Sequence, residues 1–396
     1  MNQETANDPC LLIGVDGGAT EAKAHLVHCD NPRNPTSFEL GQAAASRKYE
    51  RLADFEPLPI ADQLAQRDAG SIQLTPKEQI QGTMWVQTAC EAVLDVARAA
   101  GGRQVLVGMG MPGLKTTDRR GICAVNNGPR IPDYLDQFEQ RVAELGVELV
   151  APVAALGSDA DYCGVGELYA ANGLFREVDN AYYVGCGTGI ADAMKLRGRL
   201  VTFDEARPWL QKAWQIPSAE GPTFEKLVSA KSVNDCYARF LGGDALGEPR
   251  YPEADAAEGH PLAVSWMDSV ARILAELIFE RLDTIANGRC DLAHRGKAYD
   301  QLDAAHDFRG TFLDRVVIGQ RLGQVFAHRR YRPVFGDKLI TYLAAAIAES
   351  GDTEMMRHYL RGVRLRPGFC RASKLRAAPA LGAAIAATQT MQGTVS

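Results

Sequence analysis

The sequence predicts a two-lobe α/β protein in which each lobe has a mixed sheet flanked by helices. Two observations carry this prediction. Strand-like residues 11–16 lead through a small-residue turn into a second run at 22–27, and a strand, a glycine-rich turn and a strand follow again at 181–196. Two runs joined by a short turn indicate a β-hairpin. Its return about 170 residues later indicates an internal duplication, with two similar lobes facing one another.

The segments around the two hairpins show helical and strand patterns. Apolar residues recur every three or four positions at 79–100 and at 262–285, so we expect a helix over each range. Continuous apolar runs predict strands at 105–110 and 315–319. The alanine-rich residues 377–387 predict a closing helix whose small side chains let a neighbouring element approach closely.

The composition is that of an ordinary globular protein. The chain has 396 residues, of which 46% are hydrophobic and 23% charged, and this length suits two large lobes. Lys and Arg number 43 against 49 Asp and Glu, with no local basic run, so no nucleic-acid partner is expected. No apolar run is long enough for a membrane span, and residues 1–9 carry two acids and no base, unlike a secretory signal. We therefore expect a cytoplasmic protein with no membrane partner.

The nine cysteines are odd in number, scattered, and never form a C-x-x-C pair. In a chain of this size that pattern favours reduced core thiols over a disulfide framework or a zinc site.

The first hairpin turn has residues suited to phosphate and magnesium. Asp16 ends the first strand and is followed by Gly17, Gly18 and Thr20. Glycine N–H groups and a threonine hydroxyl can reach phosphate oxygens, and a carboxylate at the mouth of the turn can hold Mg²⁺ through water. The alternative is an ordinary hairpin turn in which glycine supplies positive φ. The second glycine-rich turn, at 187–189, is by itself equally weak evidence for phosphate binding, but the presence of two such turns is a more specific signal than either one.

An acid also stands where a predicted strand gives way to a helix. Asp159 follows the mostly apolar residues 149–156, and a carboxylate placed there can accept a proton from a substrate hydroxyl. The alternative is a helix N-cap, which Ser and Asp favour, and these residues alone favour the cap. Glu167, two turns along the same predicted helix, is expected to be structural.

Six segments taken together resemble the ROK sugar kinases. They are G-x-D-G-G-x-T at 14–20, G-M-P-G at 110–113, S-D-A-D-x-x-x-x-G-E at 158–167, G-T-G at 187–189, G-x-x-F-E-x-x-x-S at 221–229 and A-L-G-A-A at 380–384. The first turn also looks like that of BadF-type ATPases and N-acetylglucosamine kinases. The resemblance implies the two-lobe actin-like ATPase (ribonuclease H-like) fold, which hexokinase and the heat-shock chaperones share, with a nucleotide cleft between the lobes.

The resemblance also implies roles for individual residues. Asp159 matches the general base that activates the sugar hydroxyl, and Asp16 is placed to hold Mg²⁺ through water. The residues that match sugar contacts are Asn126 or Asn127, Ser158 and Glu225. The residues that match the ATP site are Gly17, Gly18 and Thr20 in the first phosphate loop, Gly187, Thr188 and Gly189 in the second, and Gly319 at the start of the adenosine-side turn.

The positions of these motifs predict two lobes and a C-terminal helical segment. Residues 1–155 form an N-terminal lobe with the first phosphate loop. Residues 156–378 form a C-terminal lobe with the catalytic Asp, the second loop and the adenosine side. Residues 379–396 form a helix that packs back on the N-terminal lobe.

The chain departs from the family pattern in four places. ROK proteins usually carry G-E-x-G-H and then a C-x-C-x-x-x-x-C zinc site, but residues 190–220 hold neither His nor Cys, so no zinc is expected. The usual N-D-A-N has become S-D-A-D, which adds Asp161 beside the predicted base. The adenosine turn reads G-Q-R-L from Gly319, and residues 286–310 look like an insertion.

The function expected from these residues is ATP- and Mg²⁺-dependent phosphoryl transfer to a hydroxyl of a hexose or amino sugar. A homodimer is left open. The alternative is a catalytically degenerate sugar- or nucleotide-binding regulator on the same scaffold. Its DNA-binding version is not expected, because ROK repressors carry a helix-turn-helix domain ahead of the first hairpin and only ten residues precede Leu11. A BadF-type redox ATPase would need cysteine ligands for an iron–sulfur cluster, and Cys123 and Cys163 have no suitable neighbours.

Overall fold

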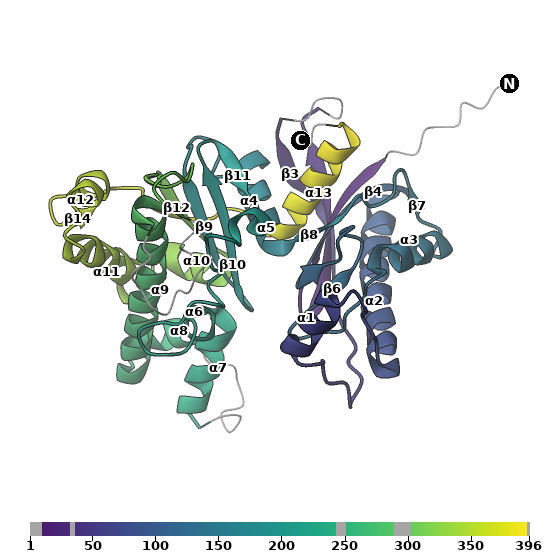
Figure 1. Ribbon diagram of the computed structural model, residues 1–396, viewed down its shortest axis with the longest axis horizontal. Helices are drawn as coiled ribbons and strands as arrows, with labels where there is room; N and C mark the ends of the chain where they lie inside the picture. The colour runs from purple at the N-terminus through teal and green to yellow at the C-terminus, as the bar shows by residue number, and fades with distance from the viewer. Residues whose placement is uncertain (1–9, 32–35, 243–250, 289–301, 394–396) are drawn as a thin grey trace. The chain divides into compact units, whose positions relative to one another are not determined.

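The chain folds into two compact units. The computed structural model describes residues 10–31, 36–242, 251–288 and 302–393. Unit 1 comprises Met1–Asn172 with Ala377–Ser396, and unit 2 comprises Gly173–Arg376 (Figure 1). The division falls after Asn172 and not at the expected position between 155 and 156. The reason is that helix α4 (Asp159–Tyr169), which carries Asp159, packs within unit 1.

Unit 1 is built on a mixed sheet with the order β3-β2-β1-β4-β7, and β8 also pairs with β4. Its strands are β1 (Leu11–Gly17), β2 (Glu21–Cys29), β3 (Phe38–Lys48), β4 (Gln104–Met111), β7 (Glu148–Leu149) and β8 (Leu156–Ser158). The first three strands are antiparallel, whereas β4 runs parallel to β1, β7 and β8. The carboxyl ends of β1, β4 and β8 therefore meet at one edge of the sheet.

Helices cover the unit 1 sheet and close its core. They are α1 (Ile60–Asp68), α2 (Pro76–Ala100), α3 (Tyr134–Glu144), α4 and α13 (Ala378–Met391), with a small ribbon of β5 (Leu114–Lys115) and β6 (Ile122–Ala124). Helix α2 begins with Pro76 after Thr75, whose hydroxyl caps the Glu78 N–H at 3.1 Å, and it ends at Gly101 with φ of 74°. These start and stop signals explain why the expected helix at 79–100 forms slightly longer.

Helix α13 approaches the strands closely because the facing positions lack side chains. A Cβ atom added to Gly14 would lie 1.8 Å from the Ala380 carbonyl oxygen, and one added to Gly108 would lie 1.9 Å from that of Ala383. On the other side of the helix, Gly382 meets the backbone of Tyr162 in α4. The yellow helix lies along the purple β1 strand in Figure 1. The predicted close approach of a small-residue closing helix is thus confirmed.

Unit 2 repeats the strand order of unit 1. Its sheet has the order β11-β10-β9-β12-β15, with β9 antiparallel to β10 and parallel to β12. These strands are β9 (Ala181–Cys186), β10 (Ile190–Leu196), β11 (Arg199–Val201), β12 (Arg315–Gly319) and β15 (Cys370–Ala372). Each unit therefore has a hairpin followed by parallel strands, and the predicted duplication of the hairpin is confirmed.

The helices of unit 2 include the long α9, which packs against α8 and α11. They are α5 (Phe203–Ala206), α6 (Phe224–Val228), α7 (Ala230–Phe240), α8 (Pro252–Ala257), α9 (Pro261–Asn287), α10 (Gln320–Ala327), the 3₁₀ turn η4 (Arg332–Val334), α11 (Gly336–Glu349) and α12 (Thr353–Tyr359), and a ribbon joins β13 (Leu360–Arg361) to β14 (Arg364–Leu365). Each unit has its own apolar core, centred on β1 and β4 in unit 1 and on β9, α9 and β12 in unit 2.

Three further expectations meet the structure here. Within its described residues, the eight cysteines are free thiols, and four of them are buried: Cys90, Cys123, Cys163 and Cys186. Cys10 is exposed, so the expectation of core thiols is only partly correct. No helix of the described residues is long and apolar enough to cross a membrane. The central part of the expected insertion at 286–310 lies outside the described residues.

Candidate active site

Two acids lie at the carboxyl edge of the unit 1 sheet. Asp16 on β1 pairs with Gly110 on β4, and Gly110 pairs in turn with Gly157 on β8. Asp159 follows two residues later as the first residue of α4. Gly110 lies on the strand between the two acids and has no side chain to separate them. A Cβ atom added to it would lie 3.6 Å from the Asp159 Cα. The topology thus brings Asp16 and Asp159 to one place, although 142 residues separate them.

The environment of Asp16 favours its protonated form. Burial, together with the negative charge of Asp159, raises the pKa of Asp16 from 3.8 to about 7, and Lys23 only partly offsets this. Two carboxylates that share a partly buried site repel one another, so one of them holds its proton more tightly. A divalent cation bound at this edge would relieve that repulsion. The oxygen donors and the excess of negative charge suit Mg²⁺.

Asp159 is held at a helix start and is not the N-cap itself. Ser158 occupies the N-cap position but makes no capping hydrogen bond with its side chain, and both residues are half-buried. The Asp159 carboxylate accepts from the N–H of Ala160 at 2.9 Å. Asp159 therefore lies at the start of α4 with one carboxylate oxygen bonded to the backbone of that helix.

The first hairpin turn is shaped by packing and not by positive φ. A Cβ atom on Gly17 would lie 2.0 Å from the Met111 sulfur, and the N–H of Gly18 closes the turn on the Glu21 carbonyl at 2.9 Å. Neither glycine adopts a positive φ. Thr20 is exposed, and in the described part of the chain its N–H donates to no protein group. The turn therefore offers a free backbone donor beside Asp16.

The predicted sugar contacts of unit 1 lie on an anchored loop. Asn126 and Asn127 are exposed at its tip. On one side Gln63 exchanges two hydrogen bonds with the backbone of Val125, at 2.8 and 3.0 Å. On the other side Gly128 lies under the Trp85 ring, where a Cβ atom would approach to 2.3 Å. Both ends of the loop are thus held while the two amide side chains remain available to a ligand.

A buried ion pair continues the anchor of this loop. The guanidinium of Arg130 donates to both carboxylate oxygens of Glu78 at 2.8 Å, and the Arg130 N–H donates to the same carboxylate at 3.0 Å. Both side chains are almost fully buried. The sequence motifs did not single out Glu78, Arg130 or Gln63, because their roles depend on contacts across more than 50 residues of chain.

The second hairpin turn lies in unit 2. The N–H of Gly187 donates to the Gly189 carbonyl at 2.9 Å and closes the turn, and Thr188 is exposed at its tip. Among the described residues, the N–H groups of Thr188 and Gly189 have no protein acceptor. Free, adjacent backbone donors of this kind form the usual concave site for a phosphate group.

Glu225 lies against this second turn. Its carboxylate accepts from the Ile190 N–H at 2.9 Å, and a Cβ atom on Gly189 would lie 2.8 Å from the same carboxylate oxygen. Glu225 thus belongs to the unit 2 hairpin, whereas Asn126, Asn127 and Ser158 belong to unit 1. The sugar contact that the resemblance implies for Glu225 stays a prediction.

Gln320 also reaches the second turn, and the sequence motifs gave it no role. It follows Gly319, whose Cα faces the hydroxyl of Tyr183, and it adopts a φ of 55°, which glycine accepts far more readily than glutamine. Its side-chain oxygen lies 2.0 Å from where a Cβ atom on Gly187 would be. The sequence showed that glutamine replaces glycine in the segment expected to form the adenosine turn. It did not show that the Gln320 side chain would lie against Gly187 in the second hairpin turn.

The comparison with solved structures decides the fold. A ROK family glucokinase from Streptomyces griseus, solved with glucose and AMPPNP, matches with a TM-score of 0.53 at 16% identity, covering 96% of this chain and 99% of the other. The ROK hexokinase from Thermus thermophilus matches with a TM-score of 0.52 at 15% identity, covering 97% and 99%. The chain has the ROK fold.

A third solved structure shows how much this fold tolerates in function. A ROK family transcriptional regulator, a homologue of the E. coli MLC protein, matches with a TM-score of 0.55 at 14% identity, covering 97% of this chain and 79% of the regulator. No protein-family model matches the chain, and no curated protein matches it by sequence. At these identities the likeness establishes the two-lobe actin-like architecture, and the chemistry has to be argued from the side chains.

Proposed function

We propose that this protein is a sugar kinase that transfers the γ-phosphoryl group of ATP to a hydroxyl of a hexose or amino sugar. The observation that supports this most strongly is the pair Asp16 and Asp159 at the carboxyl edge of the unit 1 sheet. A regulator that only binds a sugar has no need for two neighbouring acids in a site where burial and the charge of Asp159 raise the pKa of Asp16 to about 7. Perturbed carboxylates of this kind are typical of catalytic sites.

In the proposed reaction Asp159 accepts the proton of the attacking sugar hydroxyl. The hydroxyl oxygen forms a bond to the γ-phosphorus, the bond from that phosphorus to the bridging oxygen breaks, and ADP leaves with the electron pair. Asn126 and Asn127 bind sugar hydroxyls through their exposed amides, together with Ser158. Because the transferring group needs little covalent help, positioning and charge neutralisation supply most of the rate.

The resemblance to ROK kinases assigns phosphate contacts to the backbone donors of each hairpin turn, one in each unit. Thr20 and Thr188 mark the exposed tips of these turns, and Gly319, the last residue of β12 and the N-cap of α10, is assigned to the adenosine side. Mg²⁺, when bound, neutralises charge on the β- and γ-phosphates. Asp16 fits its hydrated form, because a carboxylate with a raised pKa beside another acid gains most from a nearby cation.

A coupled ADP-release screen tests this proposal. Hexoses, amino sugars and polyols are supplied one at a time with Mg²⁺–ATP, and each rate is compared with the rate without sugar. A sugar that raises ADP release roughly tenfold, about 1.4 kcal/mol in barrier, supports the kinase. With the Asp159→Asn variant, the same sugar should leave ADP release at the rate measured without sugar.

The second candidate is a catalytically degenerate regulator that binds a sugar or nucleotide. The match to a ROK regulator and the Gln320 side chain over the phosphate turn favour it. Calorimetry separates the two candidates. Binding of a sugar or nucleotide without any stimulated ADP release across the whole screen would support the regulator and contradict the kinase.

A further inference from the structure

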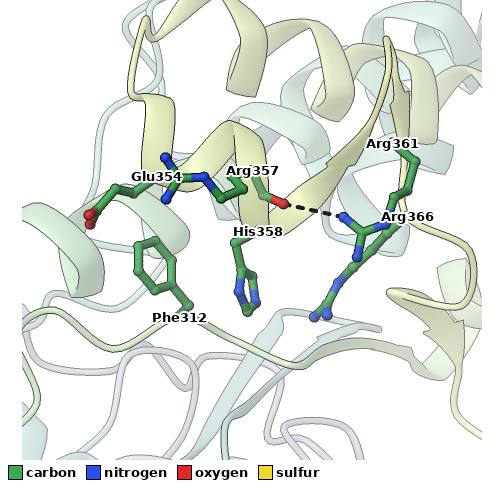
Figure 2. A pocket seen from close by; sticks show the side chains of 6 residues that line it. All are labelled: Phe312, Glu354, Arg357, His358, Arg361 and Arg366. Atoms are coloured by element: carbon green, nitrogen blue, oxygen red, sulfur yellow. Dashed lines mark hydrogen bonds between the residues drawn. The ribbon is translucent and has the colours of Figure 1, made fainter.

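A cationic cavity lies in unit 2, away from the residues assigned to the proposed kinase chemistry. It has a volume of about 520 Å³ and is lined by Phe312, Glu354, Arg357, His358, Arg361 and Arg366 (Figure 2). Three guanidinium groups and an imidazole thus face a single carboxylate. The lining residues come from the segment before β12, from α12, from β13 and from the chain after β14.

Two of the arginines are fixed in place by backbone carbonyls. Arg366 donates through Nη2 to the carbonyls of Leu313 and Asp314 at 3.0 and 2.7 Å. Arg361 donates through Nη1 to the carbonyls of Arg357 and Leu360 at 3.2 and 2.8 Å. Neutral carbonyls orient these guanidinium groups without cancelling their charge. The Nε of Arg366 is buried and has no acceptor among the described residues.

The third arginine, Arg357, contributes an exposed guanidinium to the cavity. In the described part of the chain, the Arg357 guanidinium makes no hydrogen bond or ion pair, and the residue is exposed. Its position in the last turn of α12 suits the helix dipole, which explains one cation there. The dipole does not explain Arg361 and Arg366, which other segments bring to the same cavity.

The imidazole and the apolar wall complete the cavity. His358 stacks on Phe312 with ring centroids 5.0 Å apart, and Figure 2 shows its ring between Phe312 and Arg366. Burial and the positive charge of Arg366 lower the pKa of His358, and burial lowers that of Arg366. Asp314 partly offsets both shifts, so the charges that act on these two groups are of both signs.

We propose that this cavity binds a phosphorylated small molecule. Planar guanidinium groups pair with phosphate oxygens through two parallel hydrogen bonds, and an arginine cluster is the usual recognition element for this group. The volume exceeds that of a lone phosphate and falls in the range of small-molecule sites. The phosphate lies between Arg357, Arg361 and Arg366, and the remainder of the ligand packs toward Phe312. This inference does not depend on the proposed kinase activity.

Titration calorimetry of the full chain tests the proposal with three probes: inorganic phosphate, pyrophosphate and a hexose monophosphate. The unphosphorylated hexose is the control ligand. Arg357→Gln removes a cation that makes no hydrogen bond or ion pair among the described residues, and Arg329→Gln removes another exposed arginine that lies outside the cavity. We expect at least one phosphorylated probe to bind about tenfold more weakly to Arg357→Gln than to wild type, with Arg329→Gln unchanged.

The comparison among probes identifies the source of the phosphate. Tighter binding of the hexose monophosphate than of pyrophosphate assigns an organic phosphate, and the reverse assigns an inorganic one. Equal affinity of wild type and Arg357→Gln for every probe would overturn the proposal, and so would equal losses in Arg357→Gln and Arg329→Gln. Since neither Arg357 nor Arg329 is assigned to the proposed kinase chemistry, a loss of probe binding confined to Arg357→Gln separates this site from the proposed kinase site.

Discussion

The two hairpins of this protein share a topology and differ in charge. In unit 1 the β1–β2 hairpin carries Asp16 and lies beside Asp159, so its surroundings are acidic. In unit 2 the β9–β10 hairpin carries an uncharged turn, in which the N–H groups of Thr188 and Gly189 have no acceptor among the residues that the structure describes. The same backbone topology thus presents two buried or half-buried carboxylates in one unit and uncharged backbone donors in the other. A duplicated fold repeats its hydrogen-bond ladder, but each copy takes its chemistry from the side chains at the turn.

The largest expected effect is that of Asp159→Asn. The substitution keeps the shape of the side chain but removes the proton acceptor, so turnover should fall by roughly 10²–10⁴. Since Asp159 is not the N-cap, the melting temperature and sugar binding should change little. Steady-state ADP release and thermal melting measure the two effects. Asp161→Asn is the matched control and should retain most activity. Loss confined to that control would transfer the role of base away from Asp159.

The acidic character of unit 1 predicts a pH-dependent stability. Native Asp16 keeps its proton up to about pH 7, whereas the unfolded carboxyl loses it near 3.8. Stability from this group is therefore complete below about pH 4 and is lost as the pH rises to 7, by up to about 4 kcal/mol. Asp16→Asn should remove this loss in Mg²⁺-free buffer. Urea unfolding at pH 5 and pH 8 measures it.

The pair of acids supplies its own control for this measurement. In Asp159→Asn the like charge is gone, so the pH at which stability falls should move downward. Added Mg²⁺ should stabilise wild type at pH 8 more than Asp16→Asn, because the ion binds the deprotonated carboxylate. A wild-type stability that is flat from pH 5 to 8 without Mg²⁺ would contradict the raised pKa.

The unit 2 hairpin should respond to Glu225 through its backbone. Glu225→Ala leaves the N–H of Ile190, a residue that is 7% exposed, without its acceptor, so stability should fall by about 1–3 kcal/mol. Glu225→Gln keeps an oxygen that can accept and should lie near wild type. Urea unfolding compares the variants. If both variants keep wild-type stability and raise only the KM for sugar, Glu225 acts on the substrate and not on the hairpin.

Gln320 is expected to have a smaller effect in the opposite direction. Gln320→Gly relieves the left-handed φ of 55° and should stabilise the protein by about 1 kcal/mol. Gln320→Ala leaves the φ strained but, like Gln320→Gly, removes the side chain that lies against Gly187. Calorimetry with AMPPNP should show tighter binding to both variants if the side chain blocks the turn. Weaker binding to both would instead make the glutamine amide a ligand of the nucleotide.

The metal content is expected to show no zinc. Residues 190–220, which begin with β10 of unit 2, offer neither Cys nor His. Purified protein analysed by plasma mass spectrometry should therefore contain no stoichiometric zinc, and a zinc chelator should leave the melting temperature unchanged. About one zinc per chain that resists dialysis would contradict this prediction and would require ligands from distant cysteines.

The sequence by itself determined the elements whose signals are local. Hydrophobic runs and small-residue turns predicted both hairpins, and their repetition predicted two similar units. The periodicity of residues 262–285 predicted helix α9, which forms as Pro261–Asn287. Small residues predicted the tight packing of α13, because only glycine at positions 14 and 108 leaves room for the helix backbone.

Only the tertiary structure decided which residues act together. The sequence placed the unit boundary between residues 155 and 156, whereas the structure places it after Asn172. The difference arises because α4 packs against α13, a helix that is distant in sequence and belongs to unit 1. Strand register, which no local pattern specifies, placed Asp16, Gly110 and Gly157 in one row and so brought Asp159 near Asp16. Contacts of this kind also placed Gln320 on Gly187 and gathered three arginines around one cavity. Charge and hydrogen bonding act through space, so residues far apart in the chain acquire their shared chemistry only when the chain folds.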